Sequence, residues 1–364
     1  CPRICSTTSQ TQDGVKAMNT WQKFSIRKFF NKNSGSYNGG VIALLLILLI
    51  AAALVSISIG ASKIPLSQIL LALKQRDPSS KTFQIISFVR IPRTIAAILA
   101  GCSLSLSGAI LQSVLNNSLA SPNIIGVNSG AGFLTVFISA FFPASLYLAP
   151  LAAFAGGLIA VLIVFAIAQK TGASRMSIVL SGIAVSSFIG AMTDTVLTLH
   201  PDSAIDRAVF LIGGFSGVTT ERMTYPAIFI ITGLIIALVF SYDMNILTLG
   251  DETAKSLGLS VGKLRFVFLG LAALLAGSAI SFAGLLGFVG LIVPHAARFF
   301  VGYDNRFLLP VCALLGSIFT LCCDILARVL FAPFEIPVGI IMSFLGGPFF
   351  IYLLLKRRKG KLYG

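Results

Sequence analysis

Long apolar runs separated by short polar segments dominate the chain, and their lengths predict membrane-crossing helices. A bilayer core of about 30 Å needs about 20 apolar residues in helical conformation. Ten such runs are predicted as helices, at about 41–60, 93–115, 124–141, from Pro150 to 169, 176–199, 224–242, 266–286, 288–300, 307–329 and 337–355. Short amphipathic helices are predicted near 66–74 and within 200–223, outside these runs.

The second run carries a stripe of small and polar side chains on one helical face. Its members are Thr94, Ala97, Gly101, Ser105, Gly108 and Gln112. Because unpaired polar groups are costly in hydrocarbon and small residues allow close helix contacts, the stripe must face protein or water. An uncharged polar loop follows at 116–123, and irregular backbone at membrane depth needs burial or a cavity. Stripe and loop together favour a translocation path over the alternative, tight helix packing with an interfacial turn.

Composition and charge support an all-α polytopic membrane protein. The 364 residues are 56% hydrophobic and only 11% charged, unlike a soluble domain. The net charge of +15 resides in termini and short loops, so we expect topology rather than nucleic-acid binding to explain it. With both termini cytoplasmic, that side would carry 18 Lys and Arg against 9 outside. We therefore predict a multi-pass membrane protein with a cytoplasmic basic and aromatic tail at 1–40, a ten-helix transmembrane domain at 41–355 and a basic cytoplasmic tail at 356–364.

The sequence offers no catalytic, metal or cofactor site. A phosphate-binding loop needs GxxxxGK[ST] after a strand, and the nearest segments, at 250–256 and 258–264, depart from it. The two histidines, His200 and His295, are far apart, and the six cysteines lack metal-ligand spacing, so we expect neither a metal site nor a disulfide framework. His295 and Arg298 are expected to cap the short helix at 288–300. We predict that the chain is not an enzyme.

Several long motifs resemble those of FecCD-type permeases, the membrane subunits of type II ABC importers for iron-siderophores, haem and vitamin B12. They are RIPR at 90–93, SGAILQ at 107–112, NSLASP at 117–122, GFVGLIVPHAAR at 287–298, EIPVG at 335–339 and GP at 347–348. The resemblance spans about 40–356 in family order, with Ser118 where the family commonly has proline. It implies ten helices, a second permease subunit (a copy or a paralogue), two separate ATPase subunits and an extracytoplasmic binding protein.

The resemblance also implies site residues, each with a plainer alternative. Docking of acidic groups on the binding protein is expected at Arg90, Arg93 and Arg328, where headgroup contact, or for Arg328 an ion pair with Asp324, is the alternative. Path or gate roles are expected for Ser105, Gly108, Gln112, Asn117, Leu119, Ala173 and Ser174. Coupling to the ATPase is expected from two short helices with a glycine bend, at Leu249, Gly250, Asp251, Glu252, Ala254, Leu257 and Gly258.

These features predict the permease of an ABC importer for an iron chelate, with a ferric siderophore as the first choice of substrate. The same architecture importing haem or vitamin B12 remains open. An ion-coupled secondary transporter would need acids at the membrane midplane. The two candidates, Asp194 and Asp324, fall near the outer edge. A membrane anchor without transport would lack the polar stripe.

Overall fold

The computed structural model describes residues 35–60, 65, 69, 74, 77, 79–142, 148–171, 174–201 and 204–360. Most of the predicted tail at 1–40 lies outside the described residues. So do most of the predicted amphipathic piece at 66–74, the predicted gate residue Ala173 and the last four residues. Residues 356–360 of the predicted C-terminal tail continue the final helix.

The described residues form helices and no strand. In chain order these are α2 (Gly35–Ser58), α4 (Lys81–Ile85), η1 (Ile86–Arg90), α5 (Ile91–Val114), α6 (Val127–Phe141), α7 (Ala149–Lys170), α8 (Arg175–Leu199), α9 (Ala204–Ile212), α10 (Thr220–Val239), α11 (Ser241–Thr248), α12 (Asp251–Ser256), α13 (Val261–Ala283), α14 (Val289–Val301), α15 (Asn305–Val329) and α16 (Val338–Gly360).

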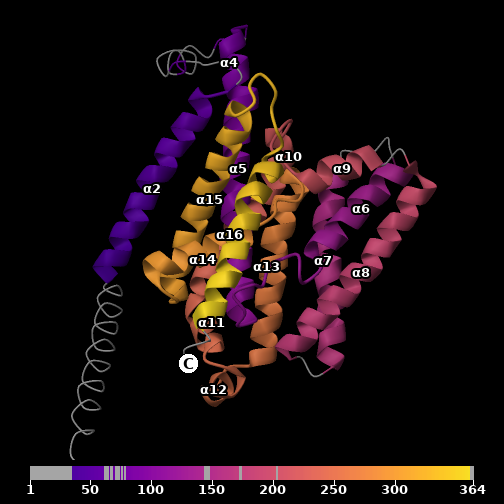
Figure 1. Cartoon of the computed structure of the whole chain (residues 1–364), viewed down its shortest axis with the longest axis vertical. Helices are drawn as coiled ribbons and strands as arrows, with labels where there is room; N and C mark the ends of the chain where they lie inside the picture. The colour runs from indigo at the N-terminus through magenta and orange to yellow at the C-terminus, as the bar shows by residue number, and fades with distance from the viewer. Residues whose placement is uncertain are drawn as a thin grey trace, which may run out of the picture.

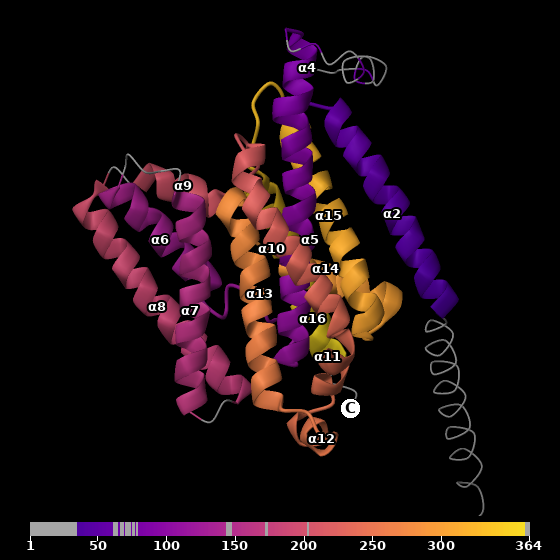
Figure 2. The same cartoon turned by 180° about the vertical axis from the view of Figure 1, so that it is seen from behind.

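The helices are arranged around α5, which packs against α13, α14 and α15 (Figures 1 and 2). Helix α2 lies along one edge against α15, while α6, α7, α8 and α9 form a group on the far side of α13. We call the end that carries α12 the lower end and the end that carries α4 the upper end, as drawn in Figure 1. Helix α2 begins, and α16 ends, at the lower end.

Seven helical segments of the described chain are long and apolar enough to cross a membrane, and three shorter apolar helices accompany them. The seven are Tyr37–Ser58, Lys81–Val114, Ala149–Lys170, Arg175–Leu199, Thr220–Val239, Val261–Ala283 and Asn305–Val329. The three shorter ones are Val127–Phe141, Val289–Val301 and Val338–Ile351. They correspond to the ten predicted runs, so the all-α polytopic fold is confirmed.

Burial separates interior helices from peripheral ones. In the most apolar 18-residue stretch of Lys81–Val114, 83% of the residues are buried inside the chain, and in that of Val261–Ala283 the share is 78%. In the corresponding stretch of Tyr37–Ser58 only 11% are buried. Apolar surface left outward on a membrane helix is suited to lipid or to another subunit. The core therefore lies between α5 and α13, and α2 is peripheral.

The second run differs from its prediction at its start. Helix begins at Lys81 rather than near 93, and it continues into α5 through the wide turn of η1. Pro92 lies two residues after this turn, and a proline ring both lacks an N–H and crowds the carbonyl four residues earlier. The wider turn relieves that crowding, so the helix continues through the proline.

Candidate functional site

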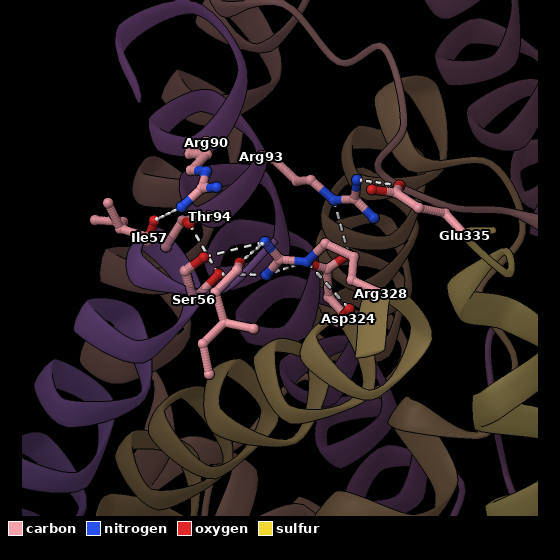
Figure 3. Close-up of polar contacts among 9 residues, drawn as sticks. Ser56, Ile57, Arg90, Arg93, Thr94, Asp324, Arg328 and Glu335 are labelled. Carbon is pink, nitrogen blue, oxygen red and sulfur yellow. Dashed lines mark hydrogen bonds and ion pairs between the residues drawn. The ribbon is translucent and has the colours of Figure 1, made fainter. Parts of the chain in front are cut away.

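Arg93 and Arg328 converge on one buried carboxylate near the upper end (Figure 3). Arg93 Nε donates to Asp324 Oδ1 at 2.9 Å, and Arg93 Nη1 donates to Glu335 Oε2 at 2.6 Å. Arg328 Nη2 lies 2.9 Å from Asp324 Oδ2, an ion pair without hydrogen-bond geometry. The Asp324 side chain is fully buried, and a buried charge is tolerated only when it is paired. This network joins α5, α15 and the segment that precedes α16.

Two of the arginines also cap the end of α2. Arg328 Nη1 donates to the carbonyl oxygens of Ser56 at 3.0 Å and Ile59 at 2.7 Å. Arg90 Nη1 donates to those of Ile57 at 2.7 Å and Ser58 at 2.9 Å. The last carbonyls of a helix lack intrahelical partners, and cations near them are stabilising. The arginines thus hold α2 to α5 and α15.

Arg90, Arg93 and Arg328, for which docking to a binding protein was predicted, are engaged within this chain. Their exposed fractions are 5%, 8% and 3%, and each guanidinium is bonded within the chain. The prediction treated charges at the end of an apolar run as free for a partner. For Arg328, the alternative ion pair with Asp324 is the one observed.

The polar stripe of α5 also faces the interior of the chain. Ser105 Oγ donates to the carbonyl oxygen of Cys312 at 2.7 Å, and Gln112 Nε2 donates to that of Gly290 at 3.1 Å. A Cβ added at Gly108 would collide with the Gly290 backbone. Ser105 and Gly108, which were predicted to line a path, are thus buried against α15 and α14 within this chain. Tight helix packing, the alternative interpretation, explains their small size.

The predicted pair of short helices is present at the lower end as α11 and α12 (Figure 1). Gly250 and Gly258 adopt positive φ values of 111° and 85°, which glycine accepts without strain. Leu249 and Leu257 are 63% and 59% exposed, whereas Ala254 is buried. The bend and the exposed apolar side chains are confirmed, and this part (residues 241–258) is called the coupling segment below, after the role expected for it.

Asp251 ties the coupling segment to two long helices. Its Oδ1 accepts from Arg265 Nη2 of α13 at 2.8 Å and from Arg175 Nη2 of α8 at 3.0 Å. Partial burial raises the pKa of Asp251, but the hydrogen bond and charge of Arg265, followed by the charge of Arg175, outweigh this effect. The resulting pKa lies below the ordinary value of 3.8. A charged carboxylate therefore bridges α12, α8 and α13 at neutral pH.

Asn245 provides a second tie, from α11 to the start of α15. Its Nδ2 donates to Asp304 Oδ1 at 2.7 Å, and its Oδ1 accepts from the Asn305 backbone N–H and from Asn305 Nδ2, both at 2.8 Å. Ser113 Oγ near the end of α5 donates to Asn305 Oδ1 at 3.1 Å. The coupling segment is thus connected to α5 as well as to α15.

The predicted gate residues lie at the lower end of the bundle. Asn117 is exposed, and its Oδ1 accepts from the Leu119 backbone N–H at 3.0 Å, which shapes the turn after α5. Ser174 is the N-cap of α8, where its Oγ accepts from the Ser177 backbone N–H at 3.0 Å. Ala173 lies outside the described residues.

Among the cavities that open on the described chain, three are similar in size. One of about 610 Å³ near the upper end is bordered by Arg93, Arg222 and Glu335. A second, of about 590 Å³, is bordered by Asn117 and Arg298 and is named the lower cavity. A third, of about 580 Å³, is lined mostly by apolar residues of four segments: Asn128, Leu211, Ile212, Leu285, Gly287, Gly339, Ile340, Ser343, Phe344 and Pro348. We name this third one the apolar cavity.

Histidine and cysteine positions show no metal-binding arrangement, since the described residues contain no group of three or more His, Cys, Asp or Glu that could hold a metal. His295 contacts the rings of Phe299 and Phe349 edge-on. Arg298 was expected to cap its own helix. Its Nη1 instead donates to Gln112 Oε1 of α5. Among the described cysteines, Cys322 is exposed, whereas Cys102, Cys312 and Cys323 are buried.

Sequence reasoning missed Arg175, Arg265 and Asn245 as partners of the coupling segment. Arg175 and Arg265 were counted only as positive charges of one membrane side. Their positions at the first turns of α8 and α13, opposite the acids of α12, were the available signal. No local sequence pattern indicated the role of Asn245, because its hydrogen-bond partners lie 59 and 60 residues further along the chain.

Comparison with known proteins agrees with this architecture. The FecCD transport family matches residues 47–356. An Fe(3+)-citrate import system permease protein, YfmD of Bacillus subtilis, is 39% identical over 84% of this chain and 91% of its own. The hemin transport system permease protein HmuU of Yersinia pestis is 34% identical over 88% and 96%. The cobalamin import system permease protein BtuC of Halobacterium salinarum is 39% identical over 75% and 74%.

A solved structure described as an inward-facing metal-chelate type ABC transporter superposes with a TM-score of 0.79 at 30% identity. It covers 87% of this chain and 99% of the other. Both the family match and the relatives extend over most of the membrane domain described above. The chain therefore belongs to the FecCD transport family, whose members are membrane permeases of ABC importers.

Proposed function

We propose that this permease imports an iron chelate, with a ferric siderophore as its substrate. A second permease subunit completes the pathway, two ATPase subunits supply the energy, and an extracytoplasmic binding protein delivers the substrate. The names of the relatives reported above refer to Fe(3+)-citrate, hemin and cobalamin. An iron(3+)-hydroxamate import permease of Bacillus subtilis is also 38% identical over 88% of this chain. Two of these four names therefore refer to iron(3+) chelates, which supports an iron chelate as the substrate.

The coupling segment is the observation that carries this proposal. Its exposed Leu249 and Leu257 flank two glycine turns at the lower end, where an apolar groove on an ATPase would receive them. Hydrogen bonds of Asp251 and Asn245 attach the segment to α8, α13 and α15. Movement of the ATPase would therefore reach long membrane helices through defined polar contacts. Glu252 is exposed beside Asp251 and is free to face the same partner.

The apolar cavity replaces the α5 stripe as the proposed wall of the pathway. It borders Gly287 and Gly339, which belong to two of the family-like motifs. Phe344 of α16, also at its border, is 75% exposed, and Leu345 beside it is 46% exposed. We infer that this face meets the second permease across the pathway. Specificity then rests largely with the binding protein, since an apolar wall binds a chelate weakly.

The gate is proposed at the lower end. Asn117 and Leu119 of the turn after α5, with Ala173 and Ser174 before α8, are the residues assigned to it. Ser174 directly precedes Arg175, whose side chain donates to Asp251 of the coupling segment. This part of the gate is therefore adjacent in sequence to a residue that contacts the coupling segment. A small shift of α12 would displace the start of α8.

The lower end is proposed to be cytoplasmic, with both termini on that side of a prokaryotic plasma membrane. The excess of Lys and Arg in the loops and tails of this side supports the orientation. The upper end then receives the binding protein. Because Arg90, Arg93 and Arg328 are engaged within the chain, we propose that they support the docking surface from below and do not contact the binding protein directly.

Uptake into vesicles tests the proposal. The permease, its ATPase subunits and the binding protein are reconstituted, and entry of a radiolabelled iron(3+) chelate is followed with and without ATP. ATP-dependent entry that requires the binding protein is expected. Entry driven by an ion gradient in the absence of ATPase subunits would instead establish a secondary transporter, and ATP-dependent entry of haem or vitamin B12 but not of iron chelates would reassign the substrate.

A further inference from the structure

Arg298 borders the lower cavity and has one hydrogen-bond acceptor among the described residues. Arg298 lies in the last turn of α14, and its Nη1 donates to Gln112 Oε1. Gln112 Nε2 is bonded to the Gly290 carbonyl oxygen, so the amide is held with its oxygen toward the guanidinium. A guanidinium has five N–H donors. Among the described residues, Gln112 is the acceptor for one of them.

Arg298 also differs from its neighbours in charge pairing. Arg265 and Arg306 at the same end form ion pairs with Asp251 and Asp304, whereas no described carboxylate forms one with Arg298. Its guanidinium carbon lies 5.8 Å from the centre of the Tyr303 ring, a contact that leaves the positive charge uncompensated. An ionisable group within a membrane bundle is costly and usually marks a functional path.

The lower cavity has the chemistry of an anion site. Its border contains one cation, no carboxylate, and several neutral hydrogen-bonding side chains. The bordering residues are Gln112, Ser113, Asn116, Asn117, Ser118, Thr248, His295, Arg298, Phe299, Tyr303 and Leu308. A volume of about 590 Å³ is within the usual range for a small-molecule site. Arginine forks suit carboxylates because two parallel N–H donors match two oxygens.

We propose that the lower cavity binds the carboxylate groups of the transported chelate as it passes the gate, with Arg298 as the anchoring cation. The assignment rests on the proposed function, since it takes the occupant to be the cargo. Asn117 and Ser118 of the gate turn border the cavity, and so does Thr248 of the coupling segment. An anion held there lies beside both parts that move during transport.

Direct binding provides the test, with citrate as a tricarboxylate probe. The full-length permease in zwitterionic nanodiscs is titrated with citrate, and the midpoint of thermal unfolding is recorded. We expect citrate to raise this midpoint for the unmodified protein. Arg298→Gln is expected to weaken citrate binding about tenfold or more, the effect of losing a charge-assisted hydrogen bond. Lys263→Gln removes one exposed positive charge near the same end and is expected to leave citrate binding unchanged.

Other occupants give different results. Absence of a citrate effect, or an effect that persists in Arg298→Gln, would overturn the assignment. An Arg298-dependent rise in the midpoint with anionic phosphatidylglycerol but not with citrate would identify a lipid headgroup instead. Loss of ATPase-subunit binding in Arg298→Gln with citrate binding intact would identify an acidic side chain of that partner. Citrate binding is measured without ATP and without uptake. A negative binding result would therefore overturn this site without bearing on whether the protein imports a chelate.

Discussion

Arg93 and Asp324 are 231 residues apart in the chain, yet Arg93 Nε lies 2.9 Å from Asp324 Oδ1. Asp324 is also paired with Arg328, and Arg93 with Glu335. One buried carboxylate therefore holds together helices from the two halves of the chain. This relationship makes the arginines of the upper end structural, and it has a direct consequence for stability.

Replacing Asp324 by Asn should destabilise the protein severely. Both Arg93 and Arg328 would lose their buried charged partner, and breaking such a pair costs about 3–5 kcal/mol. Glu335→Gln is the matched control, because the Glu335 side chain is 35% exposed and water can replace its contact. Thermal unfolding in detergent, followed by circular dichroism, measures both. Equal losses for the two variants would contradict the assigned role of Asp324.

Glycine packing between α5 and α14 gives a second prediction. Gly108→Ala places a methyl group against the Gly290 backbone and should cost about 1–3 kcal/mol, the usual penalty of overpacking. Gly270→Ala on α13 meets open space and should be neutral or stabilise by up to about 1 kcal/mol. Chemical denaturation in mixed micelles compares them. If Gly108→Ala were as stable as Gly270→Ala, the two helices would be further apart than described here.

Asp251→Asn should impair transport more than assembly. The amide weakens the bridge from α12 to Arg175 and Arg265 but leaves the exposed leucines of the coupling segment in place. Coupling energies of about 0.5–2 kcal/mol correspond to a loss of about two- to thirtyfold in uptake per ATP hydrolysed. Vesicle uptake and phosphate release are measured together. Lys263→Gln, at an exposed position of α13 outside the coupling segment, should retain normal coupling, and reduced ATPase binding by Asp251→Asn would point to a contact role instead.

The same bridge should weaken in acid. The pKa of Asp251 is lowered on folding, so its contribution to stability is fully present above the ordinary value of 3.8 and is lost as pH falls through the lower folded value. Protection of α12 backbone amides from hydrogen exchange should therefore persist at neutral pH and decrease below about pH 4. Asp251→Asn should remove this pH dependence. An unchanged acid profile in the variant would assign the effect to other carboxylates.

The sequence predicted the order and approximate limits of nearly all helices, because an apolar run of membrane length has few structural alternatives to a helix. The glycine bends at 250 and 258 and the exposed leucines beside them were equally accessible, since each depends on residues close in the chain. The start of the second helix was misplaced because Arg90 and Arg93 were taken as the polar edge of a membrane run.

What the sequence determined by itself was local: which segments are helical, which face of α5 is small and polar, and, through long motifs, the family. Only the tertiary structure decided what that face and those charges contact. Ser105 and Gly108 pack against α15 and α14, and Arg93 pairs with Asp324. The physical reason is that a small or charged side chain specifies a need for a close or polar neighbour, while the fold selects which distant segment supplies it.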